Sequence, residues 1–493
     1  MDNKIGIVTT QKYYYPKNSP FRPSKKYVEY PFNEISKTEN HVYDMVRETF
    51  HLMGYDKHNF NLPNWNPLKD IVKAGDNVVL KPNLVMDKNG SGEGTDCLFT
   101  NPAVVATVID YVVIALKGKG KIIVGDAPMQ SCDFEKLIND SGYSKMIDYY
   151  KKVLPETISI ELVDFRDLVS VEKNGVLKSH EKQDSQSIVV DLGEESSFYG
   201  ESKEYFDKIR ITNYDPALLK QHHNEKTNEY LISKDILNAD VIINIPKPKT
   251  HRKAGVTISL KNMIGVNSRK EYLPHHANGA VIEGGDEFLK KSKLKNLRNK
   301  ILDKRNYLQQ TKKAYVKVKF LNFYLKIINF LLNKFNKEVI GEGNWLGNDT
   351  ISRTITDINK IIFYADKFGA MQNEKQRKYL IVADMIISGE KDGPLRPSPK
   401  NVGMIAVGEN PVYFDEIIAR IMGAKLDKIN TFLRVRETEN SRYSLCEKGV
   451  EGFIVSLDKR FNNKTLQELK DDSIFYFKPQ GAGWVDAFLK QKS

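Results

Sequence analysis

The stretch Asp240-Val-Ile-Ile-Asn-Ile-Pro-Lys-Pro-Lys-Thr-His-Arg-Lys-Ala-Gly255 decides the fold. Its apolar part, Val241–Ile245, is typical of a strand that is buried on both faces of a parallel sheet. Pro246 and Pro248 then fix the backbone and remove two amide donors, so the chain leaves the strand along a rigid path. Ligands of open α/β proteins bind where such strands end, and we expect a functional site here. A basic turn that only caps a helix is the alternative.

The rest of the chain repeats this kind of strand between helix patterns. Strand patterns occur at residues 78–80, 121–126, 158–163, 379–384 and 403–408, and helix patterns at residues 39–53, 102–116, 133–153 and 411–422. The order of strand, loop, helix and strand between residues 78 and 126 is that of a βαβ unit, which joins parallel strands by a right-handed crossover. We therefore predict an α/β protein with a mostly parallel, twisted sheet and flanking helices.

Composition divides the 493 residues into three parts. Residues 1–70 are expected to form an N-terminal cover, and residues 71–285 and 341–493 the α/β core, in one lobe or two. Residues 286–340 are expected to be an inserted basic helical segment. Between residues 289 and 337 the sequence has 15 Lys or Arg and one acidic residue, Asp303, whereas the whole chain has a net charge of +12. The basic character therefore belongs to the inserted segment and not to the protein in general.

The end of the inserted segment, residues 316–335, mixes bulky apolar side chains with lysines. Its apolar run is too interrupted to span a bilayer, which needs about 20 consecutive apolar residues. Two interpretations stay open: the segment lies flat on an anionic membrane surface, or it packs on the protein as a helical hairpin with its lysines in water. Nucleic-acid binding ranks below both because the sequence contains no recognised nucleic-acid-binding motif.

Cysteine use and the first residues indicate a cellular location. Cys97, Cys132 and Cys446 are far apart, which excludes a disulfide scaffold and an iron–sulfur cluster made by this chain alone. Residues 1–8 pass directly into a short strand pattern without a secretion signal. We expect a cytoplasmic protein, peripheral at the inner face of the membrane if the basic segment binds lipid.

Side chains of different chemical type follow three of the expected strands. Lys81 and Asn83 follow the strand at 78–80, Asp126 ends the strand at 121–126, and Lys247, Lys249 and His251 follow the strand Val241–Ile245. Because the carboxyl ends of parallel strands meet at one edge of the sheet, these groups are expected to form a positively charged pocket. Such a pocket predicts a small anionic substrate.

Acidic and polar groups after residue 340 extend the candidate site. Asp384 ends an expected strand and Glu390 follows in a turn, where carboxylates are suited to proton transfer or to a divalent metal ion. Arg353 lies in a polar group with Asp349 and is a candidate for substrate binding. Asp349 is alternatively the N-cap of a helix.

His251, Lys261, His275 and His276 form a further set within one continuous segment. Neutral imidazoles suit nickel or zinc, so the three histidines are candidate metal ligands. Like charges favour the neutral form of a lysine, which makes Lys261 a candidate nucleophile or tether. Each residue taken alone has a structural or solvated role as its alternative.

Several motifs together resemble a known family. They are Lys81-Pro-Asn-Leu84, Thr100-Asn-Pro102, Gly125-Asp126, Asp240 to His251, Ser259-Leu-Lys-Asn262 with Gly265, and Gly389-Glu390 with Gly393-Pro394. This set resembles domain-of-unknown-function family 362 over about residues 70–430. The segment from Trp345 to Asn359 is similar to a subset of that family that occurs among surface-polysaccharide genes, which implies a role in making such polymers.

A more distant similarity is to lactate racemase-like enzymes. His251, Ala254-Gly255, Lys261 and then His275 or His276 follow the order in which that family has a histidine, a lysine that tethers a nickel-pincer nucleotide, and a metal-binding histidine. The resemblance implies reversible hydride removal from a 2-hydroxy acid or a sugar carbon. Asn101 stands where that family has an arginine, at a position that holds the substrate carboxylate.

These observations predict an enzyme for a phosphorylated, nucleotide-linked or carboxylate substrate. The candidate catalytic residues are Asp126, His251, Lys261, Asp384 and Glu390, and the candidate binding residues are Lys81, Asn83, Asn101, Lys247, Lys249, Asn262 and Arg353. One alternative is a nickel-pincer-dependent racemase or epimerase. The other is a membrane-associated scaffold that recruits polysaccharide enzymes through residues 289–337.

Overall fold

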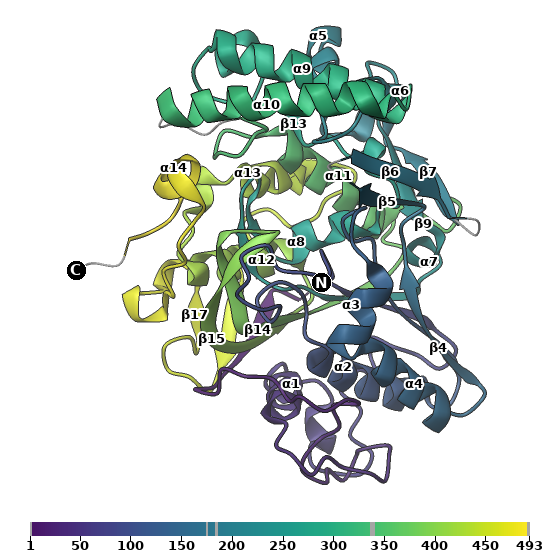
Figure 1. Ribbon diagram of the computed structural model, residues 1–493. Coiled ribbons are helices and arrows are strands. Elements are labelled where there is room, and N and C mark those ends of the chain that lie inside the picture. The colour runs from purple at the N-terminus through teal and green to yellow at the C-terminus, as the bar shows by residue number, and fades with distance from the viewer. Residues whose placement is uncertain (1, 174–175, 183–185, 336–340, 491–493) are drawn as a thin grey trace.

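An 11-stranded mixed sheet forms the centre of the part of the chain that the structure describes (Figure 1). The structure is a computed structural model, and it describes residues 2–173, 176–182, 186–335 and 341–490. In pairing order the main strands are β17 (Lys464–Thr465), β16 (Phe453–Ser456), β1 (Lys4–Thr9), β15 (Arg396–Gly408), β14 (Lys378–Asp392), β10 (Val241–Ile245), β2 (Asn77–Pro82), β3 (Gly120–Asp126) and β4 (Ile158–Asp164). The short strands β11 (Lys249–His251) and β12 (Gly255–Thr257) continue the sheet beside β14.

The strand β10, which contains the apolar run Val241–Ile245, lies in the middle of this sheet. β10 pairs in parallel with β2 on one side and with β14 on the other, so that Val241 lies opposite both Val78 and Lys378. β2, β3 and β4 continue in parallel, whereas β15 is antiparallel to both β14 and β1. The predicted α/β fold with a mostly parallel sheet is confirmed, and the carboxyl ends of β2, β3 and β10 share one edge.

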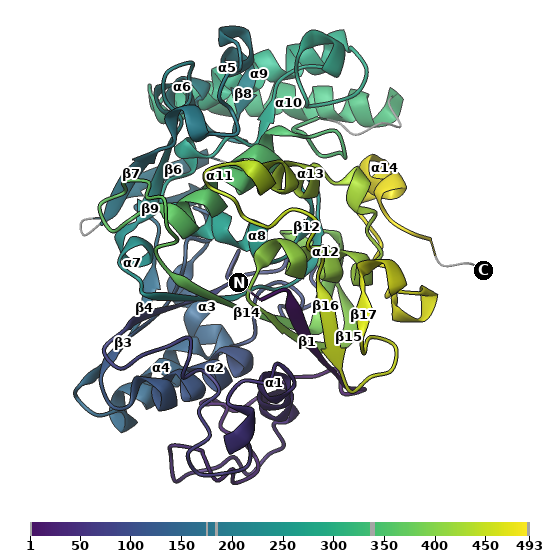
Figure 2. The same ribbon diagram turned by 180° about the vertical axis from the view of Figure 1, so that it is seen from behind.

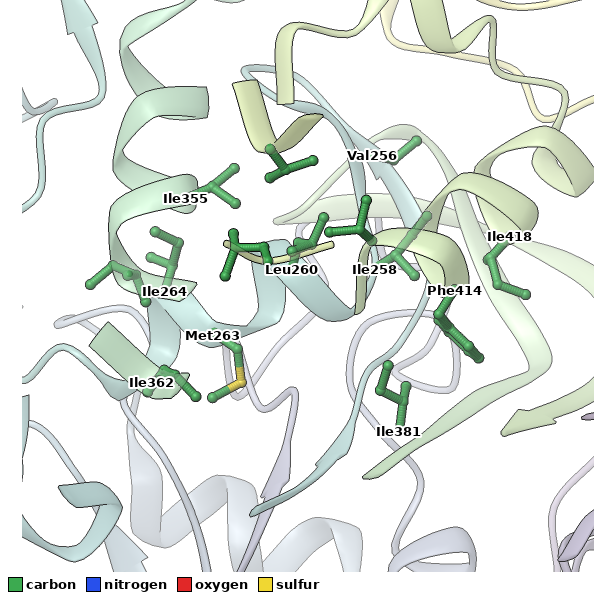
Figure 3. Packing of buried hydrophobic residues seen from close by; sticks show 14 of the residues in the cluster. Val256, Ile258, Leu260, Met263, Ile264, Ile355, Ile362, Ile381, Phe414 and Ile418 are labelled. Atoms are coloured by element: carbon green, nitrogen blue, oxygen red, sulfur yellow. The ribbon is translucent and has the colours of Figure 1, made fainter. Parts of the chain in front are cut away.

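Helices cover both faces of the sheet (Figures 1 and 2). One core contains α1 (His41–Leu52), α2 (Pro102–Leu116), α3 (Phe134–Ser141) and α4 (Tyr143–Val153), and the other contains α8 (Ser259–Asn262), α11 (Thr350–Tyr364), α12 (Pro411–Met422) and α13 (Asn430–Arg436). Alternate strand residues enter opposite cores, with Leu80 in the first and Val79 in the second. Figure 3 shows how Leu260, Ile355 and Phe414 pack in the second core.

Two expected segments have more structure than their sequence patterns indicated. Residues 1–70, expected as an N-terminal cover, include β1, which pairs with β15 and β16 in the central sheet. Its Ile5 and Ile7 are buried in the second core, which explains why this apolar strand is not a surface element. The single helix expected at residues 133–153 is two helices, because Gly142 adopts a φ of 90° that ends α3 before α4 begins.

The inserted basic segment is a helical hairpin, as expected for its composition. It consists of α9 (Lys293–Gln310) and α10 (Tyr315–Phe335), which pack on each other, and α9 also contacts α6 (Pro216–His222) and β6 (Val176–Glu181). Residues 336–340 of the predicted segment lie outside the described residues. Among the helices that the structure describes, none is long and apolar enough to cross a membrane.

Small elements complete the chain near this hairpin. They are β5 (Leu168–Lys173), which pairs with β6; β7 (Ser187–Asp191), which pairs with β9 (Glu229–Ser233); β8 (Ile209–Arg210), which pairs with β13 (His276–Ala277); and the helices α5 (Lys203–Lys208), α7 (Lys234–Leu237) and α14 (Gly481–Trp484). The chain segment between β10 and α9 connects this region to the carboxyl edge of the main sheet.

Candidate functional site

A cavity of about 240 Å³ lies at the carboxyl edge where β2, β3 and β10 end. Six residues of the predicted site line it: Asn83, Asp126, His251, Lys261, Asn262 and His275. They come from the loop after β2, the end of β3, β11, the short helix α8 and the segment before β13. The topology therefore brings together groups that are up to about 190 positions apart in the sequence, as the parallel-strand argument predicts.

The carboxylate of Asp126 has a partner inside the protein. Its Oδ1 lies 2.7 Å from Nζ of Lys81, which is fully buried on β2, and its Oδ2 accepts a hydrogen bond of 2.7 Å from the Leu84 amide. Burial lowers the pKa of Lys81 although Asp126 opposes this effect. A Cβ atom on Gly265 would lie 2.0 Å from Oδ1 of Asp126, so glycine is required where the turn after α8 meets the end of β3.

Asparagines connect the strand ends behind the cavity wall. Oδ1 of Asn262 accepts a hydrogen bond of 2.9 Å from Nδ2 of Asn83, and the side-chain oxygen of Asn83 accepts one of 2.6 Å from Nζ of Lys249. Burial, with the nearby Lys247 ammonium, lowers the pKa of Lys249 to about 7. Lys249 and Lys81 therefore hold the lining residues in place without lining the cavity themselves.

His251 is held in one tautomer by backbone amides. Its Nδ1 accepts hydrogen bonds of 3.1 Å from the amides of Lys253 and Ala254, so the proton of the neutral ring is on Nε2. Burial and neighbouring cations lower the pKa of His251 well below its ordinary value. A ring that presents an N–H to the cavity donates a hydrogen bond but has no lone pair for a metal ion or for a proton. This geometry does not fit the expected roles of His251 as a base or metal ligand.

Three lysines lie around the cavity without a carboxylate ion pair among the described residues. Burial, as the largest cause, lowers the pKa of each of Lys253, Lys261 and Lys270 to about 8. Lys253 donates to the carbonyl of Glu342, and Lys270 donates to the carbonyl of Ala127 at 3.3 Å. Within the part of the chain that is described, the Lys261 ammonium makes neither a hydrogen bond nor an ion pair, so it is available to a ligand.

His275 has the opposite tautomer to His251. Its Nδ1 is 2.6 Å from the carbonyl of Leu273 and therefore carries the proton, which leaves the lone pair on Nε2. Burial lowers the pKa of His275 to about 3, so the ring is neutral. His276 is buried on β13 and is not part of the cavity lining. Residues 2–173, 176–182, 186–335 and 341–490 contain no group of three or more His, Cys, Asp or Glu that could hold a metal ion, so the expected three-histidine metal site does not form.

Comparisons with known proteins show the family of the chain. A family model described as a domain of unknown function, DUF362, matches residues 78–183 and 205–420. The chain belongs to the DUF362 family. The thylakoid-associated protein sll1697 of Synechocystis sp. is 26% identical over 196 residues, which are 40% of this chain and 40% of that protein. The DUF362 chain thus spans less than half the length of this curated relative, and no solved structure matches it.

The DUF362 match includes every predicted residue that lines the cavity, and the predicted membership of this family is confirmed. Two other predicted residues form a buried pair outside the cavity lining. Nζ of Lys247 lies 2.9 Å from Oδ2 of Asp384, and both side chains are fully buried. Asp384 also accepts a hydrogen bond of 2.5 Å from the Tyr15 hydroxyl and one of 2.9 Å from the Asn101 amide. Asp384 is thus held by buried partners and does not line the cavity.

Three further candidates are also structural in this DUF362 protein. Glu390 lies inside β14 and accepts a hydrogen bond of 3.0 Å from a backbone amide of the C-terminal segment. Arg353 on α11 pairs with Asp349 at 2.7 Å, and the Asp349 side chain makes no N-cap bond. The Asn101 side chain caps α2. None of the three lines the cavity.

Other lining residues were not assigned a role from the sequence. Arg252 and Lys253 stand in the basic run itself, so its charge was the signal that could have included them. No local pattern marks Lys270. Gln130 and Thr212 also line the cavity, and Nε2 of Gln130 and Oγ1 of Thr212 are buried atoms without a hydrogen-bond partner among the described residues. Such groups are rare in native proteins.

Proposed function

We propose that this DUF362 protein is an enzyme that binds a small phosphorylated or carboxylated molecule in the cavity. The main observation in support of this proposal is the excess of positive charge among the residues that line the cavity. Four cations line it, Arg252, Lys253, Lys261 and Lys270, against the carboxylates Asp126 and Glu342. Asp126 is paired with Lys81, and Glu342 is paired at 2.6 Å with Arg298. An anion that enters therefore meets cations whose charge is not already neutralised.

The proposed binding roles follow from the hydrogen-bonding capacity of each group. Lys261 and Lys270 supply ammonium donors to the anionic group, and charge-assisted hydrogen bonds of this kind are stronger than neutral ones. His251 contributes a neutral Nε2–H donor, because its Nδ1 is occupied by backbone amides. The lone pair on Nε2 of His275 accepts from a substrate hydroxyl. Together they recognise a molecule that has an anionic group and a hydroxyl group.

For the chemical step we propose proton transfer through Lys261. With the anion bound Lys261 is charged, and the lowered pKa of about 8 that it has in the free protein makes it a better proton donor than a solvated lysine, so we assign it the role of general acid. Asp126 orients the site through Lys81 and Leu84 and does not act on the substrate. This assignment keeps Lys261 as the catalytic candidate and replaces Asp384 and Glu390.

For the substrate we propose a sugar phosphate or a small hydroxy acid, used in the formation of surface polysaccharides. A cavity of about 240 Å³ is small for a ligand site, since such sites commonly occupy roughly 300–1,000 Å³. A nucleotide-linked sugar would have to extend out of it. The polysaccharide context rests on the resemblance of residues 345–359 to the subset of the family found among surface-polysaccharide genes.

Calorimetric titration tests the binding step. We expect inorganic phosphate, glucose 1-phosphate or L-lactate to bind the full-length protein, and Lys261→Met to weaken binding by at least about tenfold, as loss of a charge-assisted contact requires. Lys145→Met, which removes an exposed lysine on α4, is the matched control and should bind like the wild type. The proposal fails if none of the three probes binds or if both variants bind equally well.

A second experiment tests the chemistry. The protein is incubated with a pool of small phosphorylated and carboxylated metabolites, and mass spectrometry follows which of them is consumed. Conversion by the wild type and by Lys145→Met, but not by Lys261→Met, is the expected result. Conversion that persists in Lys261→Met would remove this lysine from the proton-transfer step.

The second candidate function, a nickel-pincer racemase or epimerase, agrees with the residues only in part. Lys261 is available for a tether, and His275 has a lone pair on Nε2. His251 does not fit a metal-ligand role because its Nδ1 accepts two amide hydrogens. We derive no chemical step through this cofactor. The test is to express the protein together with the cofactor-making enzymes and to measure its intact mass and metal content. An added mass on Lys261 together with nickel would support the racemase or epimerase function.

A further inference from the structure

The outer surface of α10 carries a row of large apolar side chains in contact with solvent. Six residues are between 42% and 71% exposed: Val316, Phe320, Phe323, Tyr324, Ile327 and Phe330. Their spacing of four, three, one, three and three residues keeps them on one side of an α-helix that has 3.6 residues per turn. Scattered exposed apolar residues are normal, but a continuous row of this kind marks an interaction surface.

Basic residues border this apolar row on both sides. The geometry of the helix places Lys317 on one side of the row, and Lys319 and Lys326 on the other. The sequence of α10 contains no acidic residue. The one acidic residue of α9, Asp303, is paired at 3.0 Å with Arg210, so it does not offset these lysines. The surface therefore combines bulky apolar side chains with a uniformly positive border.

The opposite side of α10 is anchored to the protein. Leu325, Ile328 and Leu332 are buried, so the helix already has an apolar face that packs inward. Figures 1 and 2 show α9 and α10 along the end of the molecule that is remote from α1. The exposed row is thus a second apolar face, and folding of the described chain leaves it uncovered.

We propose that α10 lies flat on an anionic lipid bilayer, with this row inserted between the lipid headgroups. Aromatic and aliphatic side chains enter the boundary of headgroups and acyl chains, and the bordering lysines meet anionic headgroups. A protein partner would need an acidic rim to match the lysines, and a nucleic acid would leave six apolar side chains without a contact. The bilayer satisfies the apolar row and the positive border at once, and this contact can form whether or not the cavity holds a ligand.

Flotation with lipid vesicles tests this proposal on the full-length protein. We expect binding to vesicles of phosphatidylcholine mixed with phosphatidylglycerol, and little binding to phosphatidylcholine alone. Phe320→Ser with Phe330→Ser should reduce the partition coefficient by about tenfold or more, because apolar insertion is lost. Lys317→Glu, Lys319→Glu and Lys326→Glu combined should reduce it by a similar factor and remove its dependence on salt concentration.

Matched controls separate the row from general surface effects. Phe368→Ser with Leu457→Ser removes two exposed apolar side chains elsewhere, and Lys145→Glu, Lys151→Glu and Lys152→Glu reverse three exposed charges on α4. Both controls should bind vesicles like the wild type. The proposal is overturned if the wild type does not bind anionic vesicles, or if the α10 variants bind like the controls. It is also overturned if sedimentation shows a dimer that the Phe320→Ser, Phe330→Ser protein cannot form, because a second copy then covers the row.

Discussion

Lys253 is buried and Lys261 and Lys270 are half-buried around a cavity, where desolvation lowers the pKa of each to about 8. A lysine in this condition is poised between its charged and neutral forms at physiological pH. An anion that binds beside it stabilises the charged form and raises its pKa again. Binding of the ligand and protonation of the lysines are therefore coupled.

This coupling predicts how affinity depends on pH. Below about pH 7 the lysines are charged before the anion arrives, so affinity for inorganic phosphate is greatest there. Above about pH 8 each of them must take up a proton on binding, and affinity should fall by up to roughly tenfold per pH unit for each lysine involved. Titrations from pH 6 to 10 measure the slope, which should be shallower in Lys261→Met. A constant affinity over this range would contradict the coupling.

Two buried Lys–Asp pairs provide a matched comparison of site and scaffold. In the wild type, Nζ of Lys81 lies 2.7 Å from Asp126 and Nζ of Lys247 lies 2.9 Å from Asp384. Asp126→Asn and Asp384→Asn each leave the buried lysine of the pair without its counter-ion. Each variant should lose about 3–5 kcal/mol of unfolding free energy. Only Asp126→Asn should also change phosphate affinity, because only Asp126 lines the cavity. If Asp384→Asn changes affinity as strongly at a permissive temperature, the division between site and scaffold is wrong. Where Asp126→Asn does not fold, replacing Lys81 by Met as well removes the unpaired charge, and Lys247→Met does the same for Asp384→Asn.

At the scale of elements, strand length decided which sequence expectations failed. The strand expected at residues 379–384 was taken to end at Asp384, but β14 continues to Asp392. Asp384 is therefore inside a paired strand and not at its edge. Asp384 interrupts the apolar run, which resumes at Met385–Ile387, and pairing with β15 continues the strand through this charged residue.

Gly265 lies in the turn that follows α8, close to the end of β3, and this position gives a prediction. Gly265→Ala would place Cβ 2.0 Å from Oδ1 of Asp126 and 2.9 Å from Nζ of Lys81, so the pair or the helix must move. We expect a loss of about 2–4 kcal/mol in unfolding free energy together with weaker phosphate binding. Denaturant unfolding and calorimetry measure the two effects. Stability equal to the wild type would show that this junction is looser than the structure indicates.

For the whole molecule, the sequence predicted the sheet better than the cavity. The ends of β2 and β3 are marked by local patterns, so Asn83 and Asp126 were expected at the edge where the structure has them, whereas Lys81 lies inside β2. Lys270 and Glu342 reach the same space only because distant segments fold over that edge, and no local pattern fixes such a path. Whether a basic side chain faces a cavity or a buried partner is likewise decided by tertiary packing, as Lys247 and its carboxylate partner show.

The same three lysines around the cavity set how the stability of the ligand-free protein responds to pH. Their pKa values are near 8 in the folded state and about 10.5 in the unfolded state, so the unfolded chain binds more protons between these values. The free energy of unfolding should therefore rise from pH 8 to pH 9, by on the order of 1 kcal/mol. Burial raises the pKa of Asp110 to about 8 and that of Asp415 to about 7, and these groups oppose the trend mainly below this window. Urea unfolding at both pH values provides the measurement, and a fall in stability would contradict it.

The ion pair between Arg298 of α9 and Glu342 ties the outer hairpin to the cavity wall. Any shift of α9 that follows adsorption of α10 on lipid is therefore transmitted to a residue that borders the bound molecule. Thermodynamic reciprocity then requires that a filled cavity alters adsorption by the same factor by which adsorption alters filling. Through the Glu342 side chain, the ligand affinity of such a protein would respond to whether α10 is adsorbed on a bilayer.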